Sequence, residues 1–288
     1  MTIRGVLAAG LVWLAGTAPL AAQDAVQRGE YLTRAGGCVS CHTAPGGTEF
    51  AGGRALATPF GTFYSPNITP DANTGIGRWT DAQFKTALRQ GVRPDGANYF
   101  PVFPYTSFTN ISDDDALAIK AYLFSLPPAR QANRAHDVWF PFSWRFLQLG
   151  WKTLYFSAGP FHPDASRDAR YNRGAYLVTA LAHCGECHTP RNMFGAVEAS
   201  MALAGTRNGP DGEPVPNITP DRATGIGQWD SQDIVELLRT GRTPEESTVK
   251  GAMREAVKDG LQFLTDADRA AIAAYLLAQK PIAHKVGG

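Results

Sequence analysis

Two five-residue motifs hold the side chains best suited to chemistry. Cys38–His42 and Cys184–His188 both read Cys-x-x-Cys-His. At this spacing two thiols can each add to one vinyl group of a porphyrin, and the adjacent histidine lies under the iron as its proximal ligand. The pattern therefore predicts two covalently attached haem c groups. The residues predicted to attach them are Cys38, Cys41, Cys184 and Cys187, and those predicted to bind iron are His42 and His188.

The number of cysteines limits the other kinds of chemistry that the two motifs could perform. The chain has four cysteines, and the two motifs use all of them, so none is left for a disulfide or a catalytic thiol. A redox or structural Cys-x-x-Cys pair followed by a chance histidine is the main alternative, but the histidine and its flanking residues recur in both motifs. Zinc would need further cysteines or paired histidines, and neither motif has them.

A methionine opposite the histidine raises the potential of a c-type haem, so the methionines are the first candidates for distal ligands. Met253 lies twelve residues before Thr265, in a stretch that we expect to be a loop because it contains Gly251. We predict that Met253 is the distal ligand of the second haem, ahead of Met201. Ordinary packing is the alternative for Met193 and Met201.

The first haem has no comparable methionine, because none lies between Cys38 and Cys184. Phe103 occupies the corresponding loop and cannot bind iron. The distal position is then filled by another side chain, reached from another domain, or left open, and His136 is the best protein candidate. A histidine in a surface loop is an equally good interpretation of His136. A His/His or open site should have a lower potential than a Met-ligated haem. We predict no catalytic residue.

The chain contains an internal repeat whose offset grows from 145 to 153 residues. We expect each copy to form short helices around a haem, with no strands, because helical caps and periodicity recur while no run alternates like a strand. This predicts two tandem all-α domains, residues 24–128 and 168–283. The Asn-Ile-Thr-Pro stretches are expected either to contact haem or simply to make turns. The matching segments are Arg28–Leu32 with Arg173–Leu177, Asn67–Asp71 with Asn217–Asp221, Trp79 with Trp229, and the predicted helix caps Thr80 with Asp230 and Ser112 with Thr265.

Residues 129–167 connect the two copies and are rich in aromatic side chains, most of them between Trp139 and Phe156. The segment is too apolar for a flexible linker. One interpretation is that it packs over the seam between the domains and fixes their geometry. The other is that it forms a docking surface for a partner enzyme.

The N-terminus has the pattern of a secretory signal peptide, residues 1–22. Arg4 precedes the apolar stretch Gly5–Leu14, and small residues follow, so we expect cleavage after Ala22. An uncleaved anchor is the alternative, although the stretch is short for a span of about 20 residues. We expect no later membrane span and a periplasmic location. The net charge of +1 indicates no preference for nucleic acid.

Several longer phrases, in order along the chain, resemble a known family. They are Cys38–Gly47, Tyr64–Asp71, Pro101–Tyr105, Phe140–Arg145 and Cys184–Asn192. Together they are similar to the multi-haem cytochrome c subunits of bacterial periplasmic dehydrogenases for alcohols, gluconate, sorbitol and aldehydes. The resemblance implies tandem cytochrome c domains. It also implies electron transfer from a periplasmic dehydrogenase toward quinone, an oxidase or a small cytochrome.

The sequence departs from this family in two ways. It has two haem motifs where the alcohol and gluconate types usually have three haem domains, and we expect no C-terminal membrane-binding part. Some relatives also have methionine where Phe103 stands. The leading hypothesis is a di-haem electron-transfer subunit without catalytic activity of its own. The alternative is a di-haem enzyme, peroxidase-like or thiosulfate-oxidising, with an open or displaceable first site; the cysteine count excludes a cysteine ligand of the thiosulfate type.

Overall fold

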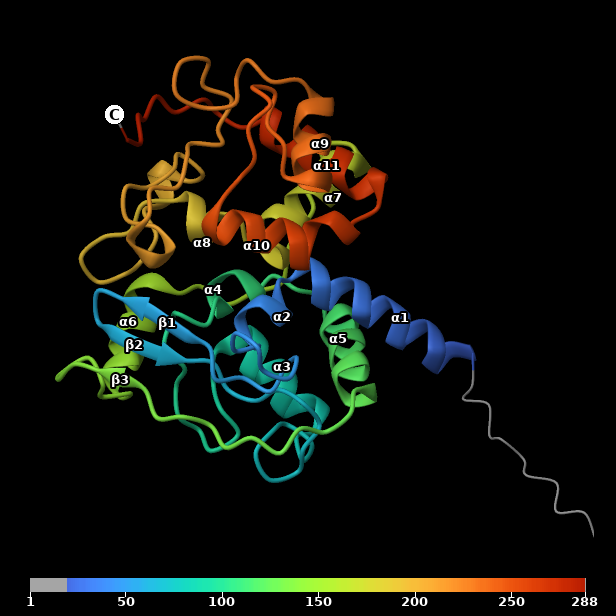
Figure 1. The fold of residues 1–288 in the computed structure, drawn as a ribbon, viewed down its shortest axis with the longest axis vertical. Coiled ribbons are helices and arrows are strands. Elements are labelled where there is room, and N and C mark those ends of the chain that lie inside the picture. The colour runs from blue at the N-terminus through green and yellow to red at the C-terminus, as the bar shows by residue number, and fades with distance from the viewer. Residues whose placement is uncertain (1–19, 288) are drawn as a thin grey trace, which may run out of the picture.

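The computed structural model describes residues 20–287 and is mostly helical (Figure 1). The predicted signal peptide lies outside the described residues except for its last three, which begin helix α1 (Leu20–Ala35). Within the described range no helix is both long and apolar enough to cross a membrane. Two halves, residues 20–128 and 168–287, lie against each other below and above in Figure 1.

The helices of the first half begin where the sequence predicts caps. Thr80 and Gln83 form a capping box at the start of α3, and the left-handed Gly91 ends that helix. The Ser112 side chain accepts the Asp115 amide at the start of α5. These caps confirm the predicted middle and last helices. After α1, the helices of this half are α2 (Cys38–Cys41), α3 (Asp81–Gln90), α4 (Tyr105–Phe108) and α5 (Asp113–Ser125).

The second half has the same order of main helices. Asp230 and Asp233 form the capping box of α9, and Thr265 caps α11. Here the first helix continues into one π-helical turn, which the sequence did not predict. The elements are α7 (Ala169–Tyr176), η1 (Leu177–Leu181), α8 (Gly185–His188), η2 (Ala199–Met201), η3 (Pro210–Gly212), α9 (Ser231–Thr240), α10 (Gly251–Asp259), η4 (Leu261–Phe263) and α11 (Asp266–Leu277).

A glycine allows the first and last helices of each half to touch. A Cβ atom on Gly29 would lie 1.9 Å from the Ala118 carbonyl oxygen of α5. A Cβ atom on Gly174 would lie 1.9 Å from the Ala271 carbonyl oxygen of α11. Only a residue without a side chain permits this backbone contact, so both glycines fix the path of the helix that leads to a Cys-x-x-Cys-His motif.

One small antiparallel sheet corrects the expectation of a strand-free fold. Strand β1 (Ala55–Thr58) pairs with β2 (Gly61–Tyr64), which pairs with β3 (Asp137–Val138) from the connector. These strands have four, four and two residues, too few to show a clear alternation in sequence. Gly61 has φ +120° and lies close to the Asp137 carbonyl, which lets β3 approach.

The two halves meet through a reciprocal pair of hydrogen bonds. Tyr31 donates to Asp268 Oδ2 at 2.6 Å, and Tyr176 donates to Asp115 Oδ2 at 2.6 Å. Each aspartate therefore receives a hydroxyl from the opposite half and a guanidinium from its own. The pairs within one half are Arg28 with Asp115 and Arg173 with Asp268.

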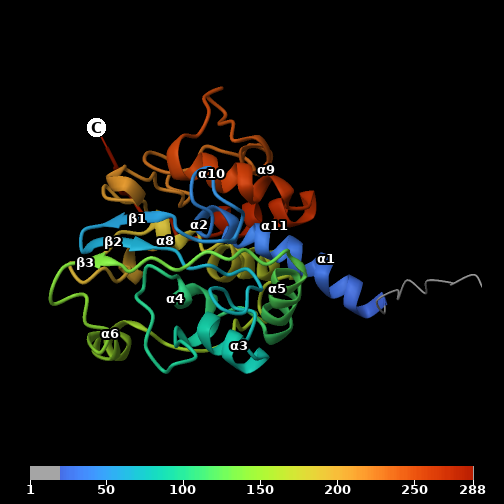
Figure 2. The same cartoon turned by 60° about the horizontal axis from the view of Figure 1, so that its bottom comes forward.

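The connector is fixed to the first half by two basic side chains. Arg145 Nη1 donates to the Asn98 carbonyl at 2.8 Å. Lys152, on α6 (Leu147–Tyr155), donates to the Asn98 side chain at 2.7 Å and to the Gln90 and Gly91 carbonyls. Figure 2 shows α6 beside the first half, below the sheet. These bonds hold the segment in place while most of its large apolar side chains remain exposed.

Candidate haem sites

Each Cys-x-x-Cys-His motif folds into a single helical turn. The His42 amide donates to the Cys38 carbonyl at 2.9 Å, and the His188 amide donates to the Cys184 carbonyl at 2.9 Å. In a helix, positions i, i+3 and i+4 share one face. The turn thus places two thiols and an imidazole side by side, which is the donor set that attaches a porphyrin and binds its iron.

Both predicted proximal histidines are oriented by a backbone carbonyl. His42 Nδ1 lies 2.8 Å from the Pro66 oxygen, and His188 Nδ1 lies 2.8 Å from the Pro216 oxygen. A carbonyl only accepts, so the proton is on Nδ1 and the Nε2 lone pair is free for a metal. Burial lowers the pKa of both imidazoles, and the bond to proline only partly opposes this. Both rings are therefore neutral at pH 7, the state that binds iron.

The carbonyls are held by the Asn-Ile-Thr-Pro stretches. Asn67 Oδ1 accepts the Thr69 amide at 2.9 Å, and Asn67 Nδ2 donates to the Ala129 carbonyl at 2.7 Å. Asn217 makes the corresponding bonds to Thr219 and Ile282. Both asparagines are buried and fully engaged with protein. The two asparagines act as turn residues that fix the neighbouring prolines. The sequence Pro-Asn-Ile-Thr-Pro occurs in both halves, and this repetition could have indicated the role.

The four thiols are uncharged and unpaired. Burial raises the pKa of Cys38 and of Cys184 to about 12, and that of Cys187 to about 11. No disulfide joins any of the four, all of which lie in the described range. A neutral thioether has no charge to desolvate, so the surroundings suit covalent attachment better than thiolate chemistry.

The second motif contacts the first half through Glu186. Its side chain, 11% exposed, accepts the hydroxyls of Thr106 at 2.7 Å and Ser107 at 2.8 Å, both from α4. Arg191 lies 2.5 Å away. Burial opposes ionisation of Glu186, but Arg191 and the two hydroxyls outweigh it and lower the pKa. The carboxylate is charged and ties the second motif to the first half.

The first motif contacts the second half through a different set of groups. Ser40 donates to Asp259 of α10 at 3.3 Å. Arg54 donates to the Ser40 carbonyl and forms an ion pair with Glu255 of α10 at 2.7 Å. Sequence reasoning missed both sets of contacts, because they join residues 79 to 219 positions apart.

The methionines differ in their surroundings. Met253 is half-buried, packs against the core and lies on α10, so the expected loop is a helix. Met201 is half-buried on η2, whereas Met193 is 81% exposed. Burial therefore favours Met253 and Met201 over Met193 as iron ligands, and the assignment of Met253 stays a prediction.

His136 has protein partners on one side of its ring. Its Nδ1 accepts the Tyr64 amide at 3.2 Å, and its ring packs against Phe63 and Phe100. Burial, with the nearby positive charges of Arg145 and Arg93, lowers its pKa to about 4. An Nδ1 that accepts places the proton on Nε2. Binding iron through Nε2 would therefore require His136 to release Tyr64.

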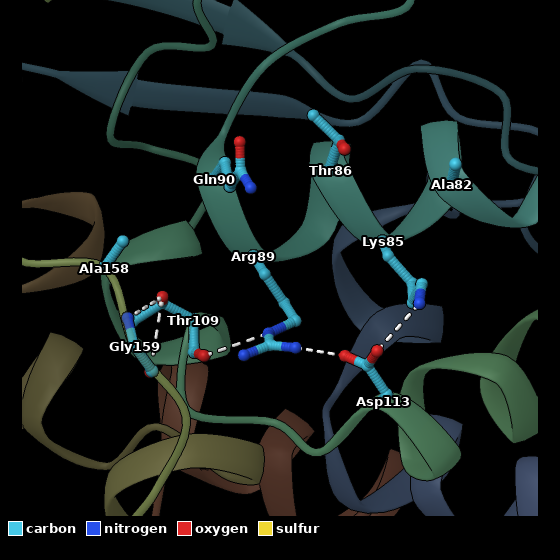
Figure 3. A pocket seen from close by; sticks show the side chains of 9 residues that line it. All are labelled: Ala82, Lys85, Thr86, Arg89, Gln90, Thr109, Asp113, Ala158 and Gly159. Atoms are coloured by element: carbon cyan, nitrogen blue, oxygen red, sulfur yellow. Dashed lines mark hydrogen bonds and ion pairs between the residues drawn. The ribbon is translucent and has the colours of Figure 1, made fainter.

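A surface cavity of about 400 Å³ lies between the first half and the connector (Figure 3). Asp113 pairs with Arg89 and accepts Lys85 Nζ at 2.7 Å. Arg89 also donates to the Thr109 carbonyl, and Thr109 Oγ1 accepts the amide of Gly159 in the connector. The charged groups satisfy one another, and no predicted haem residue lines the cavity. Its residues anchor the connector.

Comparison with known proteins shows what the chain is similar to. The cytochrome c family model matches residues 26–127. A protein named di-haem cytochrome c-type from Cereibacter sphaeroides is 45% identical over 256 residues, which are 86% of this chain and 84% of that protein. The cytochrome c subunit of alcohol dehydrogenase (quinone) from Gluconacetobacter polyoxogenes is 40% identical over 97% of this chain and 62% of its own length.

A third relative is much longer than this chain. It is a subunit of the nicotinate dehydrogenase of Pseudomonas putida, 42% identical over 280 residues, which are 94% of this chain but only 23% of that relative. The chain therefore spans about a quarter of this relative and under two thirds of the alcohol dehydrogenase subunit. Membership of this group implies covalently bound haem c, and the residues of both motifs fit that cofactor. The chain belongs to the c-type cytochromes, in the family that includes di-haem cytochrome c and the cytochrome c subunits of dehydrogenases.

Proposed function

We propose that the chain is an exported di-haem electron-transfer subunit that accepts electrons from a dehydrogenase and passes them toward the respiratory chain. Haem c, when bound, supplies a one-electron iron couple. The observation that carries the proposal is the matched orientation of His42 and His188, each with Nδ1 on a proline carbonyl and Nε2 free. Because both histidines are oriented in the same way, two haem sites are favoured over one.

Each pair of cysteines would hold one haem by thioether bonds, and the adjacent histidine would bind the iron. Met253 would complete the second site as a soft distal ligand. Its half-buried position on a helix that packs against the core supports this role better than the exposed Met193.

The first site supports a second candidate function. Phe103 lies in the loop where a ligand would be expected, and His136 Nδ1 is engaged by Tyr64. These observations favour a first haem whose distal position is open or displaceable. Such a site could react with peroxide, whereas a closed pair of sites could only relay electrons.

The names of the relatives support the proposed partner. They are subunits of alcohol, gluconate, fructose and nicotinate dehydrogenases, and the first three are named as cytochrome subunits. We infer a dehydrogenase as electron donor, and quinone, an oxidase or a small cytochrome as acceptor. Covalent haem attachment outside the bacterial cytoplasm also agrees with the predicted signal peptide of residues 1–22 and a periplasmic location.

An optical redox titration of the holoprotein, combined with near-infrared spectra, tests the proposal. We expect two one-electron transitions, the higher from a haem with the spectral signature of methionine ligation. Met253→Ala should remove this signature and lower that potential, while Met201→Ala, the matched control, should leave both unchanged. Peroxide turnover above that of free haem would favour the enzymatic alternative. A single haem per chain, or an unchanged spectrum in Met253→Ala, would contradict the assignment.

A further inference from the structure

Helix α10 contacts both halves of the molecule, each with a different face. Glu255 and Asp259 lie one turn apart and bond the first half through Arg54 and Ser40. Met253 lies about half a turn from Glu255 around the helix and packs against the core. Figure 1 shows α10 along the seam between the halves, just above α2, which it contacts. The helix that carries the predicted distal ligand of the second haem is therefore held on one side by the first motif.

Arg54 joins the first motif to this helix through two of its nitrogens. Nη1 donates to the Ser40 carbonyl at 3.0 Å, and Nη2 donates to Glu255 Oε2 at 2.7 Å. The Ser40 hydroxyl donates to Asp259 at 3.3 Å. The Arg54 side chain is only 25% exposed, so it is partly shielded from water. Because a guanidinium is planar and its donors are fixed relative to one another, these bonds set the distance between the motif and the helix.

The start of α10 has little support within its own half. Lys250, at the N-cap, makes no side-chain cap bond, and nothing lies within 4 Å of a Cβ atom built on Gly251. The helix has nine residues, which is too short for stability on its own, and Met253 lies in its first turn. The other end abuts the first half, since a Cβ atom on Gly260 would lie 2.5 Å from the Arg34 carbonyl oxygen. The position of α10 therefore depends on the first half as well as on the core.

The second motif makes the corresponding contact with the first half. Glu186 has the same place between its two cysteines as Ser40 has in the first motif. It accepts the hydroxyls of Thr106 and Ser107 on α4, which follows directly on the loop that contains Phe103. In both directions, the residue inside one motif bonds the element at the expected distal position of the other half. The seam thus connects the attachment side of each site to the distal side of the other.

We propose that Arg54 is a positioning residue for the iron site of the second half. Through Glu255 it holds α10 where Met253 can bind the iron. This inference rests on the proposed function, in which Met253 is the distal ligand. A residue of the first half then sets the fraction of chains in which the second distal position is filled by the protein. An added ligand binds only where Met253 is displaced, so its apparent affinity reports that fraction.

Imidazole titration of the oxidised holoprotein tests the proposal, with the near-infrared band of methionine ligation as the readout. Arg54→Ala should raise the apparent affinity with which imidazole removes this band by about fivefold, the change that loss of one partly exposed ion pair can cause. Glu255→Ala should have a similar effect. Arg54→Lys keeps the charge but not the two-nitrogen geometry, so its affinity should lie between those of the parent and Arg54→Ala.

Two further variants separate positioning from a general loss of stability. Arg54→Glu combined with Glu255→Arg reverses the pair and should bring the imidazole affinity closer to that of the parent than Arg54→Glu alone does. Arg239→Ala is the matched control, because it removes an arginine–glutamate pair that lies within α9 of the same half and does not cross the seam. Its methionine band and imidazole affinity should equal those of the parent. If Arg54→Ala does not fold, Arg54→Lys and Glu255→Ala still carry the test.

Three results would overturn this inference alone, in a parent protein that shows the methionine band. The variants of Arg54 could keep the parent's affinity for imidazole, or Arg239→Ala could change it as much as they do. Glu255→Ala could also leave it unchanged while Arg54→Ala raises it, which would show that Arg54 does not act through α10. A parent without the band would instead contradict the assignment of Met253 itself, and Arg54 would then have no ligand to position.

Discussion

The two halves orient their predicted proximal histidines in the same way, but they differ in the residues at the expected distal positions. His42 and His188 each donate Nδ1–H to a proline carbonyl at 2.8 Å. On the distal side, Phe103 packs in one half and Met253 in the other. The attachment side comes from the motif itself and a proline carbonyl 24 or 28 residues later, whereas the distal candidates come from a separate loop or helix. The distal residues can therefore change without disturbing the attachment side.

The largest effect is expected at the glycines that both halves share. Gly29→Ala and Gly174→Ala each place a methyl group 1.9 Å from a helix carbonyl. We expect a loss of about 3 kcal/mol or more in the free energy of unfolding, because backbone must move to relieve the overlap. Denaturant unfolding followed by circular dichroism measures it.

Gly150→Ala on α6 is the control for this pair, because nothing lies within 4 Å of a Cβ atom there. Alanine at this helical position should be neutral or stabilising by about 1 kcal/mol. Unequal losses at Gly29 and Gly174 would show that the two helix pairs are not equivalent. A neutral Gly29→Ala would contradict the contact itself.

A smaller effect is expected at the reciprocal interface. Asp115→Asn and Asp268→Asn keep the shape but leave an arginine and a tyrosine hydroxyl without their charged partner. We expect each to cost about 2 kcal/mol, with the larger loss at Asp115, whose side chain is 4% exposed against 12% for Asp268. Thermal unfolding of the holoproteins measures the difference.

Tyr31→Phe and Tyr176→Phe sharpen the same comparison, because each removes only bonds that cross between the halves: the one donated to the aspartate and the one accepted from the amide of the helix cap, Thr265 or Ser112. A loss of about 1 kcal/mol in each is expected. If both tyrosine variants were neutral while the aspartate variants were not, the aspartates would act within their own halves and the crossing bonds would contribute nothing.

Much of this arrangement follows from local sequence. The caps at Thr80, Ser112 and Thr265 depend on residues within four positions of one another, and the structure has them as predicted. Contacts such as Thr106 with Glu186 depend on how the halves meet, which no local pattern encodes. Met253 was predicted in a loop because of Gly251, and the packing of α10 overrides that preference.

The smallest effect concerns acid stability and applies to the first half alone. The pKa of His136 falls from 6.5 to about 4 on folding. Between these values the unfolded chain binds a proton that the folded protein does not, so stability falls as the pH is lowered through this window. His136→Gln can still accept the Tyr64 amide and should make stability less dependent on pH between 6.5 and 4.

Chemical denaturation at several pH values measures this slope, with the absorbance spectrum of the first haem recorded alongside. An unchanged spectrum would support His136 as a packing residue. A spectrum altered at neutral pH would instead assign His136 as the distal ligand. Both haems would then have a side chain of the protein as distal ligand.

The reciprocal bonds between Tyr31 and Asp268 and between Tyr176 and Asp115 have the form of a contact in a two-fold symmetric dimer. In a dimer of identical chains, every substitution occurs at both sites at once. Here the two partners are covalently joined and encoded separately. One site can therefore acquire a methionine and the other a phenylalanine, so a single chain can hold two iron centres of unequal potential and give the electron a preferred direction.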